Sequence, residues 1–175
     1  VSVGINSVPV VGLTATPQAI CNGGSSLLES NATAGSGTIT SINWSSALPQ
    51  NLPAGQVSPS STTNYTVTVT NSNNCSTTGA VTVNVGSIPV AAPTASATTI
   101  CGGEPTTLAA NATAGSGTIT TYAWSSGLAG NLSGGSVSPA STTTDLVTVT
   151  NSDNCSGTGS GSIAVNAAPG VGLTA

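Results

Sequence analysis

The chain has 175 residues, a formal net charge of −4 at pH 7, and no Lys, Arg or His. Nucleic-acid binding needs basic side chains that displace phosphate counterions, so this composition excludes it. The same absence removes electrostatic attraction to anionic lipid, and the sequence contains no apolar run of about 18 residues that would predict a membrane span.

The chain repeats itself at a period of 80 residues, and the ten letters of residues 31–40 return unchanged at 111–120. The two cysteines and the tryptophan of the first copy recur at the same offset: Cys21, Trp44 and Cys75 return as Cys101, Trp124 and Cys155. Such self-similarity is typical of tandem domains. We therefore predict two repeats, residues 10–89 and residues 90–169.

The residues outside these repeats look like pieces of neighbouring repeats. Residues 1–5 alternate like residues 81–85, and residues 171–175 match residues 11–15 letter for letter. We expect residues 1–9 to be the last strand and linker of a preceding repeat, or a strand donated to another copy, and residues 170–175 to open a following repeat. The residues expected in these inter-unit strands are Val1, Val3, Ile5, Val171 and Leu173.

Alternation of apolar and polar residues with a period of two predicts strands throughout. In the first repeat we expect strands at 10–16, 26–30, 38–45, 56–58, 64–70 and 80–85. Short strands separated by turn residues predict an all-β fold, with two tandem Ig-like β-sandwich domains. In the second repeat Asp145 replaces Tyr65. Because burying an unpaired carboxylate is costly, we expect that strand to start later, or Asp145 to lie at its solvent end.

The expected core is poor in bulk, because the chain has no Phe and no Met. Its predicted members are Trp44, Trp124, Tyr65, Val67, Val69, Val147 and Val149. A small domain with such a core needs additional stabilisation, such as a covalent cross-link. Paired cysteines in a chain without His predict disulfides instead of zinc, and hence an oxidising compartment. One bridge per repeat would contribute ~4 kcal/mol. Because Cys75 lies in a turn, we expect the bridge to join two loops at one end of the sandwich.

The ordered pattern of cysteine, Gly-rich turn, Trp-Ser, Ser-Pro, Thr-Thr, alternating valines, Asn-x-Cys and a final Val-x-Val strand resembles the tandem Ig-like, PKD-like repeats of very large secreted surface proteins of gliding and environmental bacteria. The WDFGDG-like motif of PKD domains is missing, so the broader Ig-like label is kept. The resemblance implies disulfides pairing Cys21 with Cys75 and Cys101 with Cys155, and a core role for Trp44 and Trp124. It also implies an adhesive or fibrous role at the cell surface, without catalysis.

Candidate glycosylation sites come from Asn-x-Ser/Thr sequons, and the expected acceptors are Asn31, Asn64, Asn111 and Asn131. Glycans would also help a chain of low charge to stay dispersed, whereas without them low net charge favours association. The segment 151–154 (Asn-Ser-Asp-Asn) offers oxygens of the kind that Ca²⁺ takes. An Asx turn before the cysteine is the favoured interpretation.

Outward threonines such as Thr66, Thr68 and Thr70 could form a flat surface that binds an ordered lattice, although threonine is common on solvent-facing strands. The four carboxylates are scattered along the chain, so no pair of them predicts catalysis.

The leading hypothesis is a non-catalytic structural component of an extracellular filament or cell-surface stalk, with further repeats or further copies of the chain as partners. The alternative is an adhesin or carbohydrate-binding module. Neither hypothesis requires a cofactor. The repeats of a fibre could be joined in one very long polypeptide, or separate subunits could exchange an end strand.

Overall fold

The computed structural model describes residues 3–45, 48–128 and 131–167. The chain divides into two compact units, Val1–Gly86 and Ser87–Ala175. The described residues form strands and no helix, and therefore include no helix that could cross a membrane. The fold is all-β, with two tandem Ig-like sandwiches.

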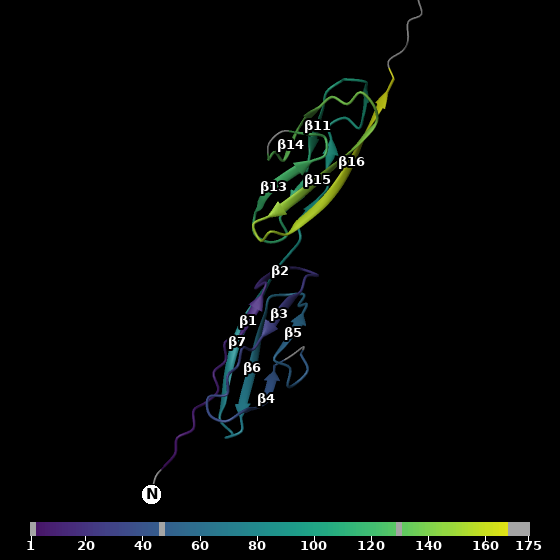
Figure 1. Cartoon of the computed structure of the whole chain (residues 1–175). Helices are drawn as coiled ribbons and strands as arrows, with labels where there is room; N and C mark the ends of the chain where they lie inside the picture. Colours follow the sequence, from purple (N-terminus) through teal and green to yellow (C-terminus); the bar gives the residue numbers. More distant parts are fainter. Residues whose placement is uncertain (1–2, 46–47, 129–130, 168–175) are drawn as a thin grey trace, which may run out of the picture. The chain divides into compact units, whose positions relative to one another are not determined.

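The first unit is a sandwich of two sheets (Figure 1). The three-stranded sheet has the order β1-β3-β5, with bounds Thr14–Thr16, Ser26–Glu29 and Ala54–Val57. The four-stranded sheet has the order β2-β7-β6-β4, with bounds Ala19–Cys21, Ser76–Gly86, Thr63–Asn71 and Ile39–Trp44. Neighbouring strands are antiparallel, except that β2 runs parallel to the end of β7.

The second unit repeats this architecture. Its three-stranded sheet is β9-β11-β14, with bounds Thr94–Ala95, Thr106–Ala109 and Gly134–Val137. Its four-stranded sheet is β10-β16-β15-β13, with bounds Thr99–Cys101, Ser156–Asn166, Thr143–Asn151 and Ile119–Trp124. A short pair, β8 (Val90–Ala91) with β12 (Ala112–Thr113), replaces the single bridge between Val10 and Thr33 in the first unit.

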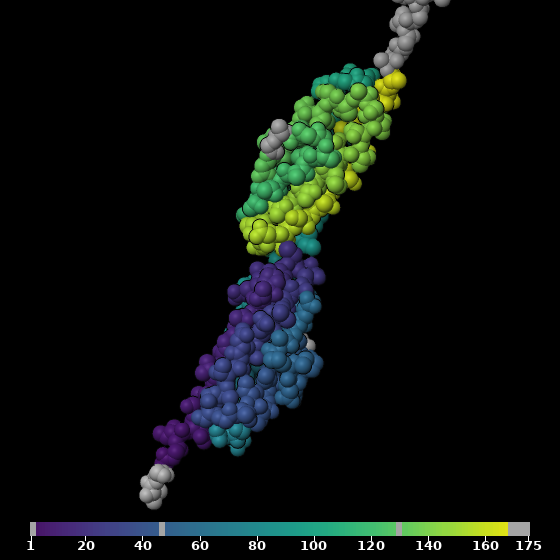
Figure 2. Space-filling model, viewed as in Figure 1, coloured from purple at the N-terminus to yellow at the C-terminus, as the bar shows by residue number. Residues whose placement is uncertain are grey.

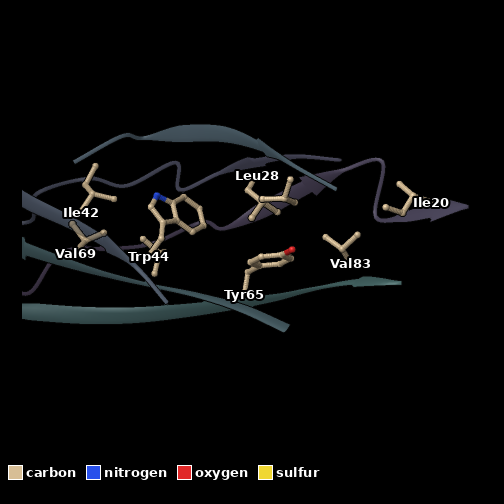
Figure 3. Packing of buried hydrophobic residues seen from close by; sticks show 9 residues of the cluster. Ile20, Leu28, Ile42, Trp44, Tyr65, Val69 and Val83 are labelled. Atoms are coloured by element: carbon tan, nitrogen blue, oxygen red, sulfur yellow. The ribbon is translucent and has the colours of Figure 1, made fainter. Parts of the chain in front are cut away.

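Alternate residues of the central strands fill the space between the two sheets. The seven residues that the sequence analysis places in the core are all buried: Trp44, Tyr65, Val67, Val69, Trp124, Val147 and Val149. Figure 3 shows Leu28 facing Tyr65, with Val83 and Ile20 continuing the row of buried side chains. Each indole N–H donates to a backbone carbonyl, Trp44 to Leu52 at 2.9 Å and Trp124 to Leu132 at 3.0 Å. The indoles therefore fill the core without leaving a buried donor unpaired.

The strands differ in places from those expected; β5, for example, was expected at 56–58 and spans Ala54–Val57. Of the strand expected at 10–16, only Thr14–Thr16 (β1) forms, because residues 11–13 have no ladder partner. The three-residue strand β2 was not expected, since a segment this short carries no visible alternation. Strand β7 begins at Ser76, four residues before the predicted start at Ala80, because residues 76–79 pair with β6 although they contain no large apolar side chain.

Residues 3–9 form no strand, and Val3 and Ile5 are 85% and 93% exposed. Figure 2 shows this dark purple end of the chain projecting from the body of the first unit. Val3 corresponds in the repeat to Val83, which is fully buried between β6 and the opposite sheet. The partner strands that would cover Val3 would belong to another repeat, so the inter-unit strand stays a prediction. Val1, Val171 and Leu173 lie outside the described residues.

Candidate functional site

Each unit has two ends with different chemistry, which we call the hairpin end and the exit end. The hairpin end holds the turn between the two longest strands, residues 71–76 in the first unit and 151–156 in the second. The exit end is where β7 or β16 finishes, beside β2 or β10. Each end carries one cysteine of the unit, so these ends are the candidate functional sites of a repeating chain.

A buried asparagine organises the hairpin end of the first unit. Asn71 is fully buried, and its Nδ2 donates to the carbonyls of Ser7 at 3.1 Å and Ala34 at 2.9 Å. Its Oδ1 accepts from the backbone N–H groups of Asn73 and Cys75, each at 3.0 Å. This is the Asx turn expected before the cysteine. One amide thus fixes the hairpin, the 34–37 turn and the incoming chain at Ser7.

The incoming chain also packs tightly on a glycine turn. Gly35 has a φ of +68°, and a Cβ at this position would lie 2.2 Å from the carbonyl oxygen of Val8. Only glycine combines a left-handed conformation with so close a backbone approach. Ser7 and Ser36 are bonded to each other as well, through the Ser7 N–H and the Ser36 Oγ at 2.9 Å. The segment that enters the unit is therefore held by several backbone contacts.

The second unit builds the same end from the corresponding residues. Asn151 Nδ2 donates to the carbonyls of Ser87 and Ala114, both at 2.9 Å, and Asn151 Oδ1 accepts from the N–H of Cys155 at 3.0 Å. Here Asp153 adds an acceptor, since its Oδ2 receives a 2.6 Å hydrogen bond from the hydroxyl of Ser116. The one carboxylate of the segment considered for Ca²⁺ thus contacts a hydroxyl, and among the described residues no three His, Cys, Asp or Glu side chains cluster to hold a metal.

At the exit end, a cysteine lies beside the last residue of the longest strand. Cys21 is the register partner of Gly86, and the N–H of Asn22 donates to the Gly86 carbonyl at 2.9 Å. In the second unit Cys101 is the partner of Asn166 in the same way. The chain therefore enters each unit at the hairpin end and leaves it at the exit end.

The expected pairing of cysteines within each unit is wrong. Cys75 and Cys101 are free thiols, whereas Cys21 and Cys155 are disulfide-bonded. The reason is distance. Strand β7 has 11 residues, so at about 3.3 Å per residue its ends lie roughly 35 Å apart, with Cys75 before one end and Cys21 beside the other. A disulfide requires Cα atoms about 4.4–6.8 Å apart.

The expected position of Asp145 is also wrong. It lies within β15, opposite Gly161, and is only 2% exposed. Among the described residues its Oδ2 has no hydrogen-bond partner, and the side chain lines an open pocket of about 470 Å³. The cavity is walled by hydroxyl-bearing and small apolar residues: Ser126, Leu128, Ser136, Val137, Ser138, Pro139 and Thr143. At the same position of the first unit the ring of Tyr65 fills the core, so the shorter aspartate leaves space.

Outward threonines are bonded to one another across the strands. Thr68 and Thr78 share a hydroxyl–hydroxyl hydrogen bond of 2.9 Å, and Thr70 bonds to Ser76 at 3.0 Å. Cross-strand hydroxyl pairs of this kind stabilise a sheet by a few tenths to about 1 kcal/mol each. The outward threonines therefore stabilise the sheet through hydrogen bonds between neighbouring strands.

The four candidate glycosylation sites differ in how their amides are engaged. Asn31 Nδ2 donates to the carbonyl of Gly12 and to Thr14 Oγ1, both at 3.1 Å, and Asn111 is held similarly by Ala92 and Thr94. The Asn131 side chain makes two hydrogen bonds: its Oδ1 accepts from the N–H of Tyr122, and its Nδ2 donates to the carbonyl of Thr120. Asn64 is exposed in β6 and makes no side-chain hydrogen bond with the described residues. Glycosylation itself stays a prediction.

No protein-family model and no curated protein sequence matches the chain. Among solved structures, the N-terminal eight Ig domains of Down Syndrome Cell Adhesion Molecule match with a TM-score of 0.53 and 14% identity, over 92% of this chain and 25% of that chain. Murine CEACAM1b matches with a TM-score of 0.48 and 13% identity, over 91% of this chain and 100% of that chain. This chain spans only a quarter of the first of these structures, and identity this low shows the Ig-like fold alone.

Proposed function

We propose that the chain is a non-catalytic structural component of an extracellular filament or cell-surface stalk, built from tandem Ig-like domains. The observation that carries this proposal is the path of the chain through each unit. The chain is bonded at the hairpin end when it enters, at Ser7 or Ser87, and leaves beside the cysteine of the opposite end, at Gly86 or Asn166. A path of this kind lets one unit follow another along the chain, as in tandem-repeat proteins.

The connection between consecutive units supports the same function, because it contains no spare residue. Gly86 is the last residue of β7, and the next residue, Ser87, already accepts a hydrogen bond from Asn151. The two units therefore follow one another in the chain without an intervening linker residue, which suits a tandem array. A surface with few charges, and without Lys or Arg, suits a fibre that associates with its own kind and gives trypsin no cleavage site.

The test measures how length grows with the number of repeats. Residues 7–166 are expressed in an oxidising compartment as one, two or three fused copies, and their shape is measured by small-angle X-ray scattering and electron microscopy. We expect rods whose maximum dimension grows by roughly 35–40 Å per domain, since a strand of β7's length spans the domain. Compact or freely jointed particles would contradict the structural role. A reducing, denaturing gel of native fibres separates one very long polypeptide from subunits of this size.

A second function, carbohydrate binding by an adhesin, is favoured by one observation, the cavity at Asp145. The buried Oδ2 of Asp145 lacks a hydrogen-bond partner in the described part of the chain, and the surrounding side chains offer four hydroxyls. Sugar hydroxyls donate readily to such acceptors, and few well-placed polar groups in a concave site fix a ligand's orientation. Glycan-array binding that is lost in Asp145→Tyr, but kept in Tyr65→Phe, would support this function. Equal binding by both variants would exclude the cavity as the site.

A further inference from the structure

The carboxylate of Asp145 has no basic side chain of the chain to pair with. Asp145 is 2% exposed, and among the described residues its Oδ2 has no hydrogen-bond partner. The chain contains no Lys, Arg or His, so none of its own side chains can supply a positive charge. Burying a carboxylate is costly unless the group is paired and hydrogen-bonded. A positive charge that pairs with Asp145 would therefore come from another molecule.

The other carboxylates of the second unit are placed differently. Asp153 accepts a hydrogen bond from the hydroxyl of Ser116, and Glu104 Oε2 accepts one from the N–H of Cys101 at 3.4 Å. Both acidic side chains are exposed, so water solvates their charge. Within the described ranges, Asp145 is thus the one buried carboxylate.

The pocket beside Asp145 has room and lining for a small molecule. Its volume of about 470 Å³ lies within the range of small-molecule sites, roughly 300–1,000 Å³. Hydroxyl groups and apolar side chains share its wall, the former from Ser126, Ser136, Ser138 and Thr143, the latter from Leu128, Val137 and Pro139. A ligand that suits this lining has a positive group for the carboxylate, further hydroxyls, and a C–H surface.

The first repeat has larger side chains at several of the corresponding positions. Of the nine residues that line the pocket, six are identical to the residues 80 positions earlier. The other three are smaller in the second repeat: Gly127 in place of Ala47, Ser136 in place of Gln56, and Asp145 in place of Tyr65. The second repeat therefore combines smaller side chains with a buried carboxylate that the first repeat lacks.

We propose that the pocket at Asp145 binds a protonated amine carried on a small, hydroxyl-rich molecule such as an amino sugar. The ammonium group donates to the Asp145 carboxylate, and a hydrogen bond between charged partners is roughly twice as strong as a neutral one. The hydroxyls of the wall bind the hydroxyls of the ligand, and Leu128 and Val137 contact its carbon skeleton. This inference rests on the second function proposed above, carbohydrate binding, and narrows its ligand class to sugars with a free amine.

The test compares four probes on the whole chain, at a pH at which the amine carries its proton: glucosamine, glucose, N-acetylglucosamine and ethanolamine. Glucose has a hydroxyl in place of the amine, N-acetylglucosamine has an uncharged amide, and ethanolamine keeps the ammonium group without the sugar ring. Calorimetric titration should show glucosamine binding at least about tenfold more tightly than the two neutral sugars. Equal affinity for the three sugars, or no binding of glucosamine, would overturn the inference.

Nuclear magnetic resonance locates the binding site, and the first repeat serves as an internal control. Glucosamine should shift the amide signals of residues 136–138 and 143–147, and leave those of the corresponding residues 56–58 and 63–67 in place. Shifts confined to the first unit would contradict binding at Asp145.

Two asparagine variants test the charge. Asp145→Asn keeps the size of the side chain and should lower the affinity for glucosamine at least about tenfold, because it removes the charged partner of the hydrogen bond. Asp153→Asn is the matched control, since it removes a carboxylate at the hairpin end of the same unit and should leave the affinity unchanged. The spectrum of each variant shows whether the second unit is folded. Folded Asp145→Asn that binds glucosamine as tightly as the unchanged chain would refute the role of the charge.

The probes also separate this inference from carbohydrate binding itself. Similar affinities for glucosamine and glucose, both lost in Asp145→Tyr, would keep the carbohydrate function and overturn the requirement for an amine. Ethanolamine that binds as tightly as glucosamine would keep the ammonium site and contradict the carbohydrate function. The growth of length with repeat number, which tests the structural function, depends on neither result.

Discussion

Tyr65 and Asp145 occupy the same position in the two units, one on β6 opposite Val81 and the other on β15 opposite Gly161. Tyr65 is buried in the core of the first unit, while Asp145 lines an open pocket of about 470 Å³ and its Oδ2 has no hydrogen-bond partner among the described residues. The second unit thus has less apolar burial at this point than the first. The pair can be exchanged to measure the difference.

Asp145→Tyr is expected to stabilise the second unit. Filling the space with a ring should raise the free energy of unfolding by about 2–3 kcal/mol, and removing a buried carboxylate adds to the gain. Tyr65→Asp should lower the free energy of unfolding of the first unit by about 3–5 kcal/mol. Hydrogen exchange with mass spectrometry resolves the two units. Asp145→Asn, which keeps the cavity but removes the charge, should give the smaller gain, and equal effects of Tyr and Asn would contradict a role for the empty volume.

Asn71→Ala should destabilise the hairpin end of the first unit. The change leaves two carbonyls and two N–H groups without their side-chain partner, and at about 1 kcal/mol net for each hydrogen bond the free energy of unfolding should fall by about 3–4 kcal/mol. Urea unfolding monitored by tryptophan fluorescence measures the loss.

The neighbouring Asn73 provides the control, because its side chain is exposed and makes no hydrogen bond with the described residues. Asn73→Ala should change the free energy of unfolding by less than about 0.5 kcal/mol. Asn151→Ala should repeat the large effect in the second unit. An Asn71→Ala variant as stable as Asn73→Ala would show that the amide is not what holds the incoming chain.

The sequence predicts the core better than it predicts the ends of the strands. Val67 and Val69 alternate with threonines, and a period of two decides which side chains are buried without any knowledge of neighbours. Cysteine pairing depends on which end of a strand each cysteine adjoins. The segment Ser76–Gly79 has no large apolar residue, so the alternation pattern does not reveal the first four residues of β7. These residues lengthen the strand and increase the distance between Cys75 at its start and Cys21 at its end.

The buried aspartate is unpredictable for a different reason. Because desolvating a carboxylate is costly, the sequence predicts a solvent-exposed position for Asp145. This expectation assumes that the core around the residue is filled. Around Asp145 the facing residue is Gly161 and an open pocket adjoins the carboxylate, so the strand keeps its register and buries the carboxylate. The two repeats thus share the same strand register at this position but differ in the side chains that are packed there.

N-glycosylation, where it occurs, is expected at Asn64 before the other three candidates. Attachment uses the amide nitrogen, which Asn31, Asn111 and Asn131 commit to hydrogen bonds, whereas Asn64 is exposed and uncommitted among the described residues. Glycopeptide mass spectrometry on the secreted chain measures the occupancy of each sequon. Asn64→Gln should remove most of the glycan mass, and higher occupancy at Asn31 than at Asn64 would contradict this ranking.

Gly159→Ala should destabilise the second unit through a backbone clash. A Cβ at Gly159 would lie 2.3 Å from the carbonyl oxygen of Ala91 and 2.7 Å from Pro93 Cδ, so the incoming segment would have to move away from β16. Overpacking of this kind costs about 1–3 kcal/mol. Gly79 is the matched control at the same position of the first unit, where the closest atom is Cγ1 of Val11 at 2.7 Å. A side chain can rotate away and a backbone carbonyl cannot, so Gly79→Ala should cost less. Thermal unfolding of both variants measures the difference, and a greater loss in Gly79→Ala would show that the approach of Ala91 to β16 does not limit the second unit.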